Sequence, residues 1–180
     1  MTPEQAKAIC IEAHKGQWRS PTDVQAKDES YILEELKNVS LRYHEQTCLL
    51  SDGRQVIKLN GITYIQEPFS SHPIAVADMM TTDEEKVIAY LHDVIEDTNI
   101  TYNELYKLGL NECDDDILNT LKLLTKQPQQ EYSLYIFNIS CCRLARKVKI
   151  ADMFHNMSTS TSEKQKAKYL KYMPILLNNL

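Results

Sequence analysis

The chain has 180 residues, 43% hydrophobic and 25% charged, which indicates one globular domain and excludes a disordered or fibrous protein. Its net charge of −5 excludes a general attraction to duplex nucleic acid or anionic membranes, so phosphate binding requires a local basic cluster. With only four glycines and three phenylalanines, the composition argues against a β-sandwich or barrel.

The cysteines point to free thiols in a reducing compartment. There are five of them, an odd number, and the neighbours Cys141 and Cys142 cannot easily bridge each other. The sequence shows no signal-peptide pattern and no apolar run of about 18 residues. We therefore expect a cytoplasmic protein without a membrane partner, while its oligomeric state stays open.

The first predicted helix begins at Pro3. Thr2 is suited to cap it, and Gln5 completes a Thr-x-x-Gln capping box. A second helix is expected at about 31–46.

A turn signal follows that second segment. Asn60 and Gly61 separate two β-prone runs, RQVIKL and ITYIQ. Because an Asn-Gly pair favours the tight turn of a hairpin, we predict a β-hairpin at about 54–66.

Helical patterns resume at Pro73. Thr82 and Thr101 each stand three residues before a glutamate, which predicts a helix cap at each threonine. Later helices are expected after the acidic run 114–116, near 131–138, over RLARKVKIADMFHNM, and after a Ser160-x-x-Glu163 cap, with Pro174 bending or ending the last one. The predicted fold is an all-α bundle with one inserted β-hairpin.

The densest group of ionisable side chains is HDVIED, residues 92–97. On one continuous helix its polar residues would share a face, next to an apolar flank. Carboxylates this close repel one another unless a cation compensates them, and histidine with carboxylate suits Mn²⁺, Fe²⁺ or Zn²⁺. Taken alone, the pattern also fits a solvated acidic helix face with a stray histidine.

Two further segments contain polar residues that could join the group at residues 92–97. Asp152 and Asn156 stand four residues apart, on one face of another predicted helix. His72 precedes Pro73 at an expected helix entrance, where a side chain can project into a cleft.

Five segments together resemble a known family. They are QAKAICIEAHKGQWR, EPFSSHPIAVADMM, VIAYLHDVIEDTNIT, LNTLKLLTK and LARKVKIADMFHNM. In this order they resemble the HD hydrolase domain of the RelA/SpoT homologues, most closely the stand-alone small alarmone hydrolases. The resemblance implies one HD domain over 1–180, with an insertion at about 21–66.

The resemblance implies a metal centre, usually with Mn²⁺. The positions that match the family's ligands are His72, His92, Asp93 and Asp152. The family's Glu-Asp pair falls on Glu96 and Asp97. The resemblance therefore implies that these two residues are the catalytic pair, which activates water and transfers protons.

The resemblance also implies a nucleotide pocket. Asn156 and Thr159 match nucleotide-contacting positions, and Arg19 matches the arginine that packs on the guanine base. Lys126 and Lys149 are the cations that we expect to neutralise phosphates. Two histidines at family positions, His14 and His155, are interpreted as structural.

Three basic residues of the family pattern are missing. Ser20, Met153 and Ser158 stand in their places, which leaves less positive charge for a highly anionic substrate. The insertion lies between Arg19 and the metal histidine, and its position in the chain suggests a lid, a pocket wall or a partner contact.

The leading hypothesis is metal-dependent hydrolysis of the 3′-pyrophosphate of (p)ppGpp, giving GDP or GTP and pyrophosphate. The alternative keeps the metal centre and changes the substrate to another phosphorylated nucleotide: the 2′-phosphate of NADPH, a nucleotide phosphoester or a pyrophosphorylated tRNA end. A non-catalytic nucleotide binder is less favoured, because an idle site has little reason to keep all six groups.

Overall fold

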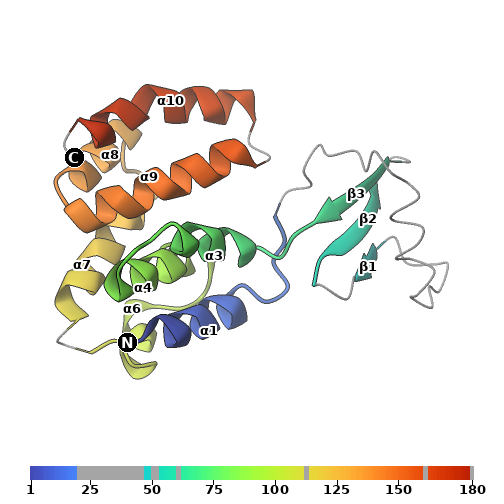
Figure 1. The fold of residues 1–180 in the computed structure, drawn as a ribbon, viewed down its shortest axis with the longest axis horizontal. Helices are drawn as coiled ribbons and strands as arrows, with labels where there is room; N and C mark the ends of the chain where they lie inside the picture. The colour runs from blue at the N-terminus through green and yellow to red at the C-terminus, as the bar shows by residue number, and fades with distance from the viewer. Residues whose placement is uncertain (20–46, 50–52, 60–61, 112–113, 160–161, 179–180) are drawn as a thin grey trace. The chain divides into compact units, whose positions relative to one another are not determined.

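The computed structural model describes residues 1–19, 47–49, 53–59, 62–111, 114–159 and 162–178 (Figure 1). The chain divides into two compact units, one of Met1–Lys15 with Ser70–Leu180 and the other of Gly16–Phe69. We call them the helical unit and the small unit. The predicted all-α bundle with an inserted hairpin is confirmed, while the assignment of 1–180 to one domain with an insertion at 21–66 stays a prediction.

The helical unit contains helices whose order follows the chain. They are α1 Pro3–Ala13, α3 Ser71–Asp78, α4 Asp83–Leu91, α5 Val94–Asp97, α6 Tyr102–Lys107, α7 Asp115–Leu124, α8 Tyr132–Ser140, α9 Arg143–Ser158 and α10 Glu163–Leu177. None of the helices in the described ranges is long and apolar enough to cross a membrane.

The three predicted capping boxes are confirmed. In each, a threonine hydroxyl accepts a hydrogen bond from the backbone N–H three residues later, and the side chain of that later residue accepts from the threonine N–H. The pairs are Thr2 with Gln5 at α1, Thr82 with Glu85 at α4, and Thr101 with Glu104 at α6.

The predicted start of the last helix needs correction. Its N-cap is Ser162, whose hydroxyl accepts from the Gln165 N–H, and not Ser160. Of the two outcomes predicted for Pro174, a bend or an end, the end is excluded, because the helix continues to Leu177. Leu176 is fully buried, so tertiary packing holds the turn that follows the proline.

Residues 92–97 do not form one continuous helix, so that prediction is wrong. α4 ends at Leu91, His92 and Asp93 form a turn, and α5 begins at Val94. The His92 Nδ1 lies 2.7 Å from the carbonyl oxygen of Ala89, the acceptor that the Asp93 N–H would use in a continuous helix. This competing hydrogen bond favours the break.

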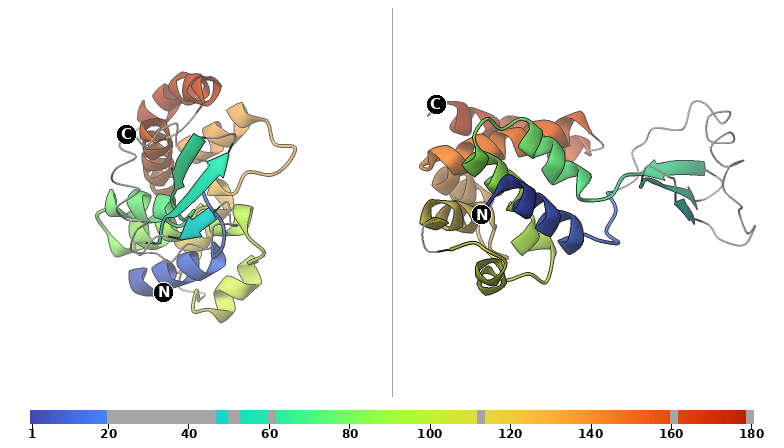
Figure 2. Two further views of the ribbon diagram at one scale, coloured as in Figure 1. Left: turned by 90° about the vertical axis from the view of Figure 1, so that its right-hand side faces the viewer. Right: turned by 60° about the horizontal axis from the view of Figure 1, so that its bottom comes forward.

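α9 lies at the centre of the helical unit. It packs against α3, α4, α7, α8 and α10, and Figure 2 shows it between α10 and the pair α3 and α4. Met153, midway along α9, is completely buried. The family's basic residue is therefore replaced by a core side chain, which cannot contact a substrate from this position.

The small unit contains a three-stranded antiparallel sheet in the order β1 Thr47–Leu49, β2 Gln55–Leu59 and β3 Ile62–Gln66. β2 and β3 pair from Gln55 with Gln66 to Leu59 with Ile62, so the predicted hairpin is confirmed. β1 was not predicted. The Asn-Gly turn and the helix predicted at 31–46 lie outside the described residues.

Candidate metal centre

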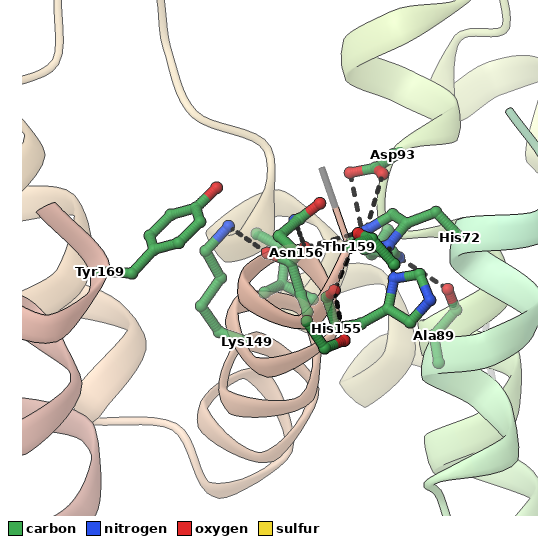
Figure 3. Close-up of polar contacts among 12 residues, drawn as sticks. His72, Ala89, Asp93, Lys149, His155, Asn156, Thr159 and Tyr169 are labelled. Carbon is green, nitrogen blue, oxygen red and sulfur yellow. Dashed lines mark hydrogen bonds and ion pairs between the residues drawn. The ribbon is translucent and has the colours of Figure 1, made fainter. Parts of the chain in front are cut away.

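Three parts of the helical unit bring four predicted metal ligands together, two of which, His72 and Asp93, are labelled in Figure 3. His72 lies in the first turn of α3, His92 and Asp93 form the α4–α5 turn, and Asp152 lies midway along α9. His72, His92 and Asp152 are buried, and Asp93 is half-buried. Residues far apart in the sequence therefore converge on one point.

The distances between the donor atoms suit one metal ion. His72, His92 and Asp93 offer ligand atoms that all lie within 4.8 Å of one another. The His92 Nε2 lies 3.2 Å from an Asp93 oxygen, and the His72 Nε2 lies 3.7 Å from the other. Donors bound to one ion at about 2.1 Å are roughly 3.0–3.5 Å apart, close to these spacings.

His92 supplies the strongest independent sign of a ligand. Its Nδ1 bonds the Ala89 carbonyl, which fixes the proton on Nδ1 in the neutral ring and leaves a lone pair on Nε2. That Nε2 is buried and makes no well-aligned hydrogen bond among the described residues, although carboxylate oxygens of Asp93 and Asp152 lie 3.2 and 3.9 Å from it. A buried nitrogen that faces two carboxylates without a good hydrogen bond is suited to binding a cation together with them.

The carboxylates around His92 hold positive charge at the site. Burial would lower the pKa of His92, but Asp93 and Asp152 outweigh it and raise the pKa to about 9. The site thus attracts either a proton or a metal ion, as a ligand set of histidines and carboxylates does.

Asp152 is the most heavily bonded ligand. One oxygen lies 2.9 Å from the His72 Nε2 and accepts from the Asn156 amide at 2.6 Å, while the other lies 2.7 Å from the Lys149 ammonium. Burial would raise the pKa of Asp152, but Lys149 and the neighbouring histidines hold it well below its usual value. The carboxylate therefore stays ionised in a buried position.

Glu96 and Asp97, the predicted catalytic pair, lie on α5 directly after the ligands. Glu96 is exposed, and one of its oxygens accepts from the Lys126 backbone N–H at 3.1 Å. Partial desolvation and the charges of Asp93 and Glu96 raise the pKa of Asp97 to about 6, although the residue keeps contact with solvent. Asp97 therefore holds a proton more readily than a free carboxylate does.

Four of the five predicted substrate residues belong to the helical unit, and one belongs to the small unit. Asn156 and Lys149 contact Asp152 directly, and Thr159 ends α9, where its hydroxyl donates to the His155 carbonyl at 2.9 Å. Lys126 is tied to Glu96 through its backbone. Arg19 belongs to the small unit, so its contact with a base stays a prediction.

Two residues were missed in the sequence. His155 was interpreted as structural, but its Nδ1 lies 2.7 Å from the Nδ1 of His72. Lys168 lies beyond the recognised segments, and its ammonium sits 4.3 Å from the centroid of the Tyr132 ring. Burial and the charges of Lys149 and Lys126 lower its pKa. No signal within a single helix reveals these contacts, because each joins two helices.

Comparison with known proteins gives sequence relatives over about half of the chain. Over 104 residues, 52% of this chain, it is 38% identical to a guanosine-3′,5′-bis(diphosphate) 3′-pyrophosphohydrolase of Haemophilus influenzae. Over the same length it is 34% identical to the bifunctional (p)ppGpp synthase/hydrolase SpoT of Escherichia coli and 36% identical to the GTP pyrophosphokinase rsh of Brucella ovis. These alignments span only 14–15% of the relatives' own length.

One solved structure has a similar fold over nearly the whole chain. It is described as a metazoan ortholog of SpoT that hydrolyses ppGpp, and it matches 98% of this chain and 84% of its own with a TM-score of 0.59 at 15% identity. No family model matches the chain. The sequence relatives and the shared fold agree: over about half of its length the chain is similar to SpoT-type proteins, which supports its resemblance to the HD hydrolase domain of the RelA/SpoT homologues.

Proposed function

We propose that this protein hydrolyses the 3′-pyrophosphate of (p)ppGpp, giving GDP or GTP and pyrophosphate. The observation that carries the proposal is the convergence of His72, His92, Asp93 and Asp152 beside the exposed carboxylates of α5. Named relatives that act on this nucleotide support the choice of substrate.

Those four residues would hold a divalent cation, which we propose to be Mn²⁺. Imidazole nitrogens with carboxylate oxygens suit such an ion better than Mg²⁺, which prefers oxygen ligands alone. When bound, the ion supplies a Lewis acid for phosphoester chemistry.

Glu96 and Asp97 would then move the protons. Glu96 accepts a proton from the water that attacks the phosphorus, and Asp97 donates one to the oxygen that leaves as the P–O bond breaks. A pKa of about 6 leaves part of the Asp97 population protonated just below neutral pH. One water is consumed: its hydroxyl is bound to the phosphorus of the released pyrophosphate, and the leaving oxygen of the nucleotide gains a proton.

We propose that lysines bind the phosphates in place of the missing basic residues. Lys126, Lys149 and Lys168 come from the α7–α8 loop, α9 and α10, and burial together with the charges of Lys149 and Lys126 lowers the pKa of Lys168. Asn156 and Thr159 would contact the nucleotide from α9, and Arg19 would stack on the base.

A second candidate is another phosphorylated nucleotide, and the burial of Met153 is the observation that favours it. Because a core methionine replaces the family's basic residue, the pocket offers one fewer cation to a bis-diphosphate. NADPH, a simple nucleotide phosphoester and a pyrophosphorylated tRNA end carry less or differently placed phosphate. A cytoplasmic location fits each of these substrates.

A substrate panel with added Mn²⁺ tests the proposal. Purified protein should release pyrophosphate from ppGpp with a kcat/KM at least 100-fold above its activity on NADPH, a 3′-nucleotide or a pyrophosphorylated tRNA. A preference for any of those three would contradict the alarmone assignment and retain the metal centre. Equal inactivity on all four substrates would reject both candidates.

A further inference from the structure

His155 of α9 meets His72 of α3 beside the metal-binding cluster. Their Nδ1 atoms are 2.7 Å apart, and their ring centroids are 4.9 Å apart at an interplanar angle of 39°. Two ring nitrogens at this distance share one proton in a hydrogen bond, so one must donate and the other must accept. The protonation patterns of the two rings are therefore coupled.

The other nitrogen of His72 decides the direction of this bond. Its Nε2 lies 2.9 Å from an Asp152 oxygen and 3.7 Å from an Asp93 oxygen. Because a carboxylate only accepts, the Nε2–H of His72 donates to Asp152 when no cation is bound, and a bound cation takes the place of that proton. A histidine that binds a cation through Nε2 must offer a lone pair there and carry its proton on Nδ1. The Nδ1–H of His72 then has to donate, and the facing nitrogen of His155 has to accept.

We propose that His155 is a positioning residue, whose Nδ1 accepts the proton of His72 and keeps the Nε2 of His72 available as a metal ligand. The inference rests on the metal centre of the proposed function. It assigns to His155 the role that a backbone carbonyl has at His92, where the Nδ1 bonds the Ala89 oxygen at 2.7 Å. Acceptors of this kind orient metal-binding histidines and strengthen their binding.

The position of His155 on α9 suits this role. It follows Asp152 by three residues, so both side chains lie on one face of the helix and reach the same ring of α3 (Figure 3). One helix therefore supplies a ligand and also the acceptor that orients a second ligand. Phe154, the next residue towards the N-terminus, is exposed and provides a matched control on the same turn.

Manganese affinity measured by EPR titration of the wild-type protein and three variants tests the inference. His155→Leu removes the acceptor, His155→Gln replaces it with an amide oxygen, and Phe154→Leu changes a neighbour that points away. We expect His155→Leu to weaken Mn²⁺ binding about 10–100-fold. His155→Gln should stay within about threefold of the wild type, and Phe154→Leu should not change the affinity.

Nitrogen NMR of the wild-type protein loaded with diamagnetic Zn²⁺ gives a second readout that needs no variant. The proton should be on Nδ1 of His72 and on Nε2 of His155. Unchanged Mn²⁺ affinity in His155→Leu, equal weakening in folded His155→Gln, or a proton on Nδ1 of His155 would each overturn the inference. A wild-type protein that binds no Mn²⁺ rejects the proposed metal centre itself, whereas tight binding without ppGpp hydrolysis rejects only the substrate.

Discussion

Asp152 keeps its negative charge in a buried position because both of its oxygens have partners. The Lys149 side chain is 15% exposed and pairs with one oxygen, and the His72 ring and the Asn156 amide contact the other. A buried ion pair contributes little net stability, but removing one partner alone is costly because the other charge stays uncompensated. Lys149 thus supports the metal-free site, in addition to its proposed contact with phosphate.

Replacing Lys149 with methionine should destabilise the metal-free protein by about 3 kcal/mol, because the Asp152 carboxylate then lacks its partner. Saturating Mn²⁺ should restore more stability to this variant than to the wild type, since the ion supplies the missing positive charge. Urea unfolding with EDTA and with Mn²⁺ measures both effects. Lys122→Met, on the exposed face of α7, serves as the control.

Equal destabilisation of Lys149→Met with and without Mn²⁺ would contradict this role. It would mean that Lys149 contributes through packing on the Tyr135 ring, which its ammonium approaches at 5.4 Å, and not through the charge of Asp152.

At the scale of elements, Glu85 connects the start of α4 to α9. Its carboxylate is fully buried and accepts from the Thr81 hydroxyl and backbone N–H, and it lies 2.6 Å from the Lys147 ammonium of α9. Burial would raise the pKa of Glu85, but the bonds from Lys147 and Thr81 outweigh it and lower the pKa to about 2. The capping box is thus also a tertiary link.

The Glu85→Gln variant should lose about 1–3 kcal/mol of stability at pH 7, because a charge-assisted hydrogen bond is removed from a buried site. Since the folded pKa of about 2 lies below the unfolded value of 4.5, the contribution of Glu85 is present above pH 4.5 and lost as the pH falls towards 2. Urea unfolding between pH 7 and pH 2.5 should show the two proteins converging.

Glu84→Gln, in the same turn of α4, should cost much less at pH 7 and serves as the control. A difference between Glu85→Gln and the wild type that stays constant down to pH 2.5 would show that the ionised form of Glu85 is not the source of its contribution.

How far the sequence predicts each element depends on how local its cause is. Thr2, Thr82 and Thr101 were recognised as caps because each box lies within four residues. The break after Leu91 was missed, because it involves a side-chain bond from His92 to the backbone that periodicity does not report. α10 passes Pro174 because Leu176 is buried by tertiary packing, which a local rule cannot include.

The same distinction applies to the site. The four proposed metal ligands could be named from motifs, since each motif resembles a family segment. The contact between His155 and His72, and the approach of Lys168 to Tyr132, could not be named, because they depend on how α9 meets α3 and how α10 meets α8.

For the whole molecule, the two compact units divide the predicted tasks. All four proposed metal ligands belong to the helical unit, whereas Arg19, the predicted base-stacking residue, belongs to the small unit. The ends of the small unit are paired with each other, through backbone bonds from Arg19 to Glu67 and from Phe69 to Gln17. Metal binding and base recognition should therefore respond separately to changes in the small unit.

Deleting residues 48–64, with a short Gly-Ser linker in their place, should leave the Mn²⁺ affinity unchanged and raise the KM for ppGpp at least fivefold. The reason is that the deletion removes the sheet from the unit that carries Arg19 and spares every metal ligand. EPR titration and steady-state kinetics measure the two quantities. Unchanged kinetics and an unchanged substrate range would reject a role of the insertion in the pocket.

We propose that a metal held by the two histidines and two aspartates of the candidate metal centre acts together with a carboxylate of α5 to hydrolyse ppGpp. The most direct test of this claim is the initial rate of pyrophosphate release from ppGpp with Mn²⁺, with EDTA, and with the Glu96→Ala variant in Mn²⁺. We predict release by the wild type with Mn²⁺, none with EDTA, and a rate about 10²–10⁴-fold lower for the variant that still binds Mn²⁺. Release that persists in EDTA, or that is unaffected by loss of Glu96, would contradict the claim.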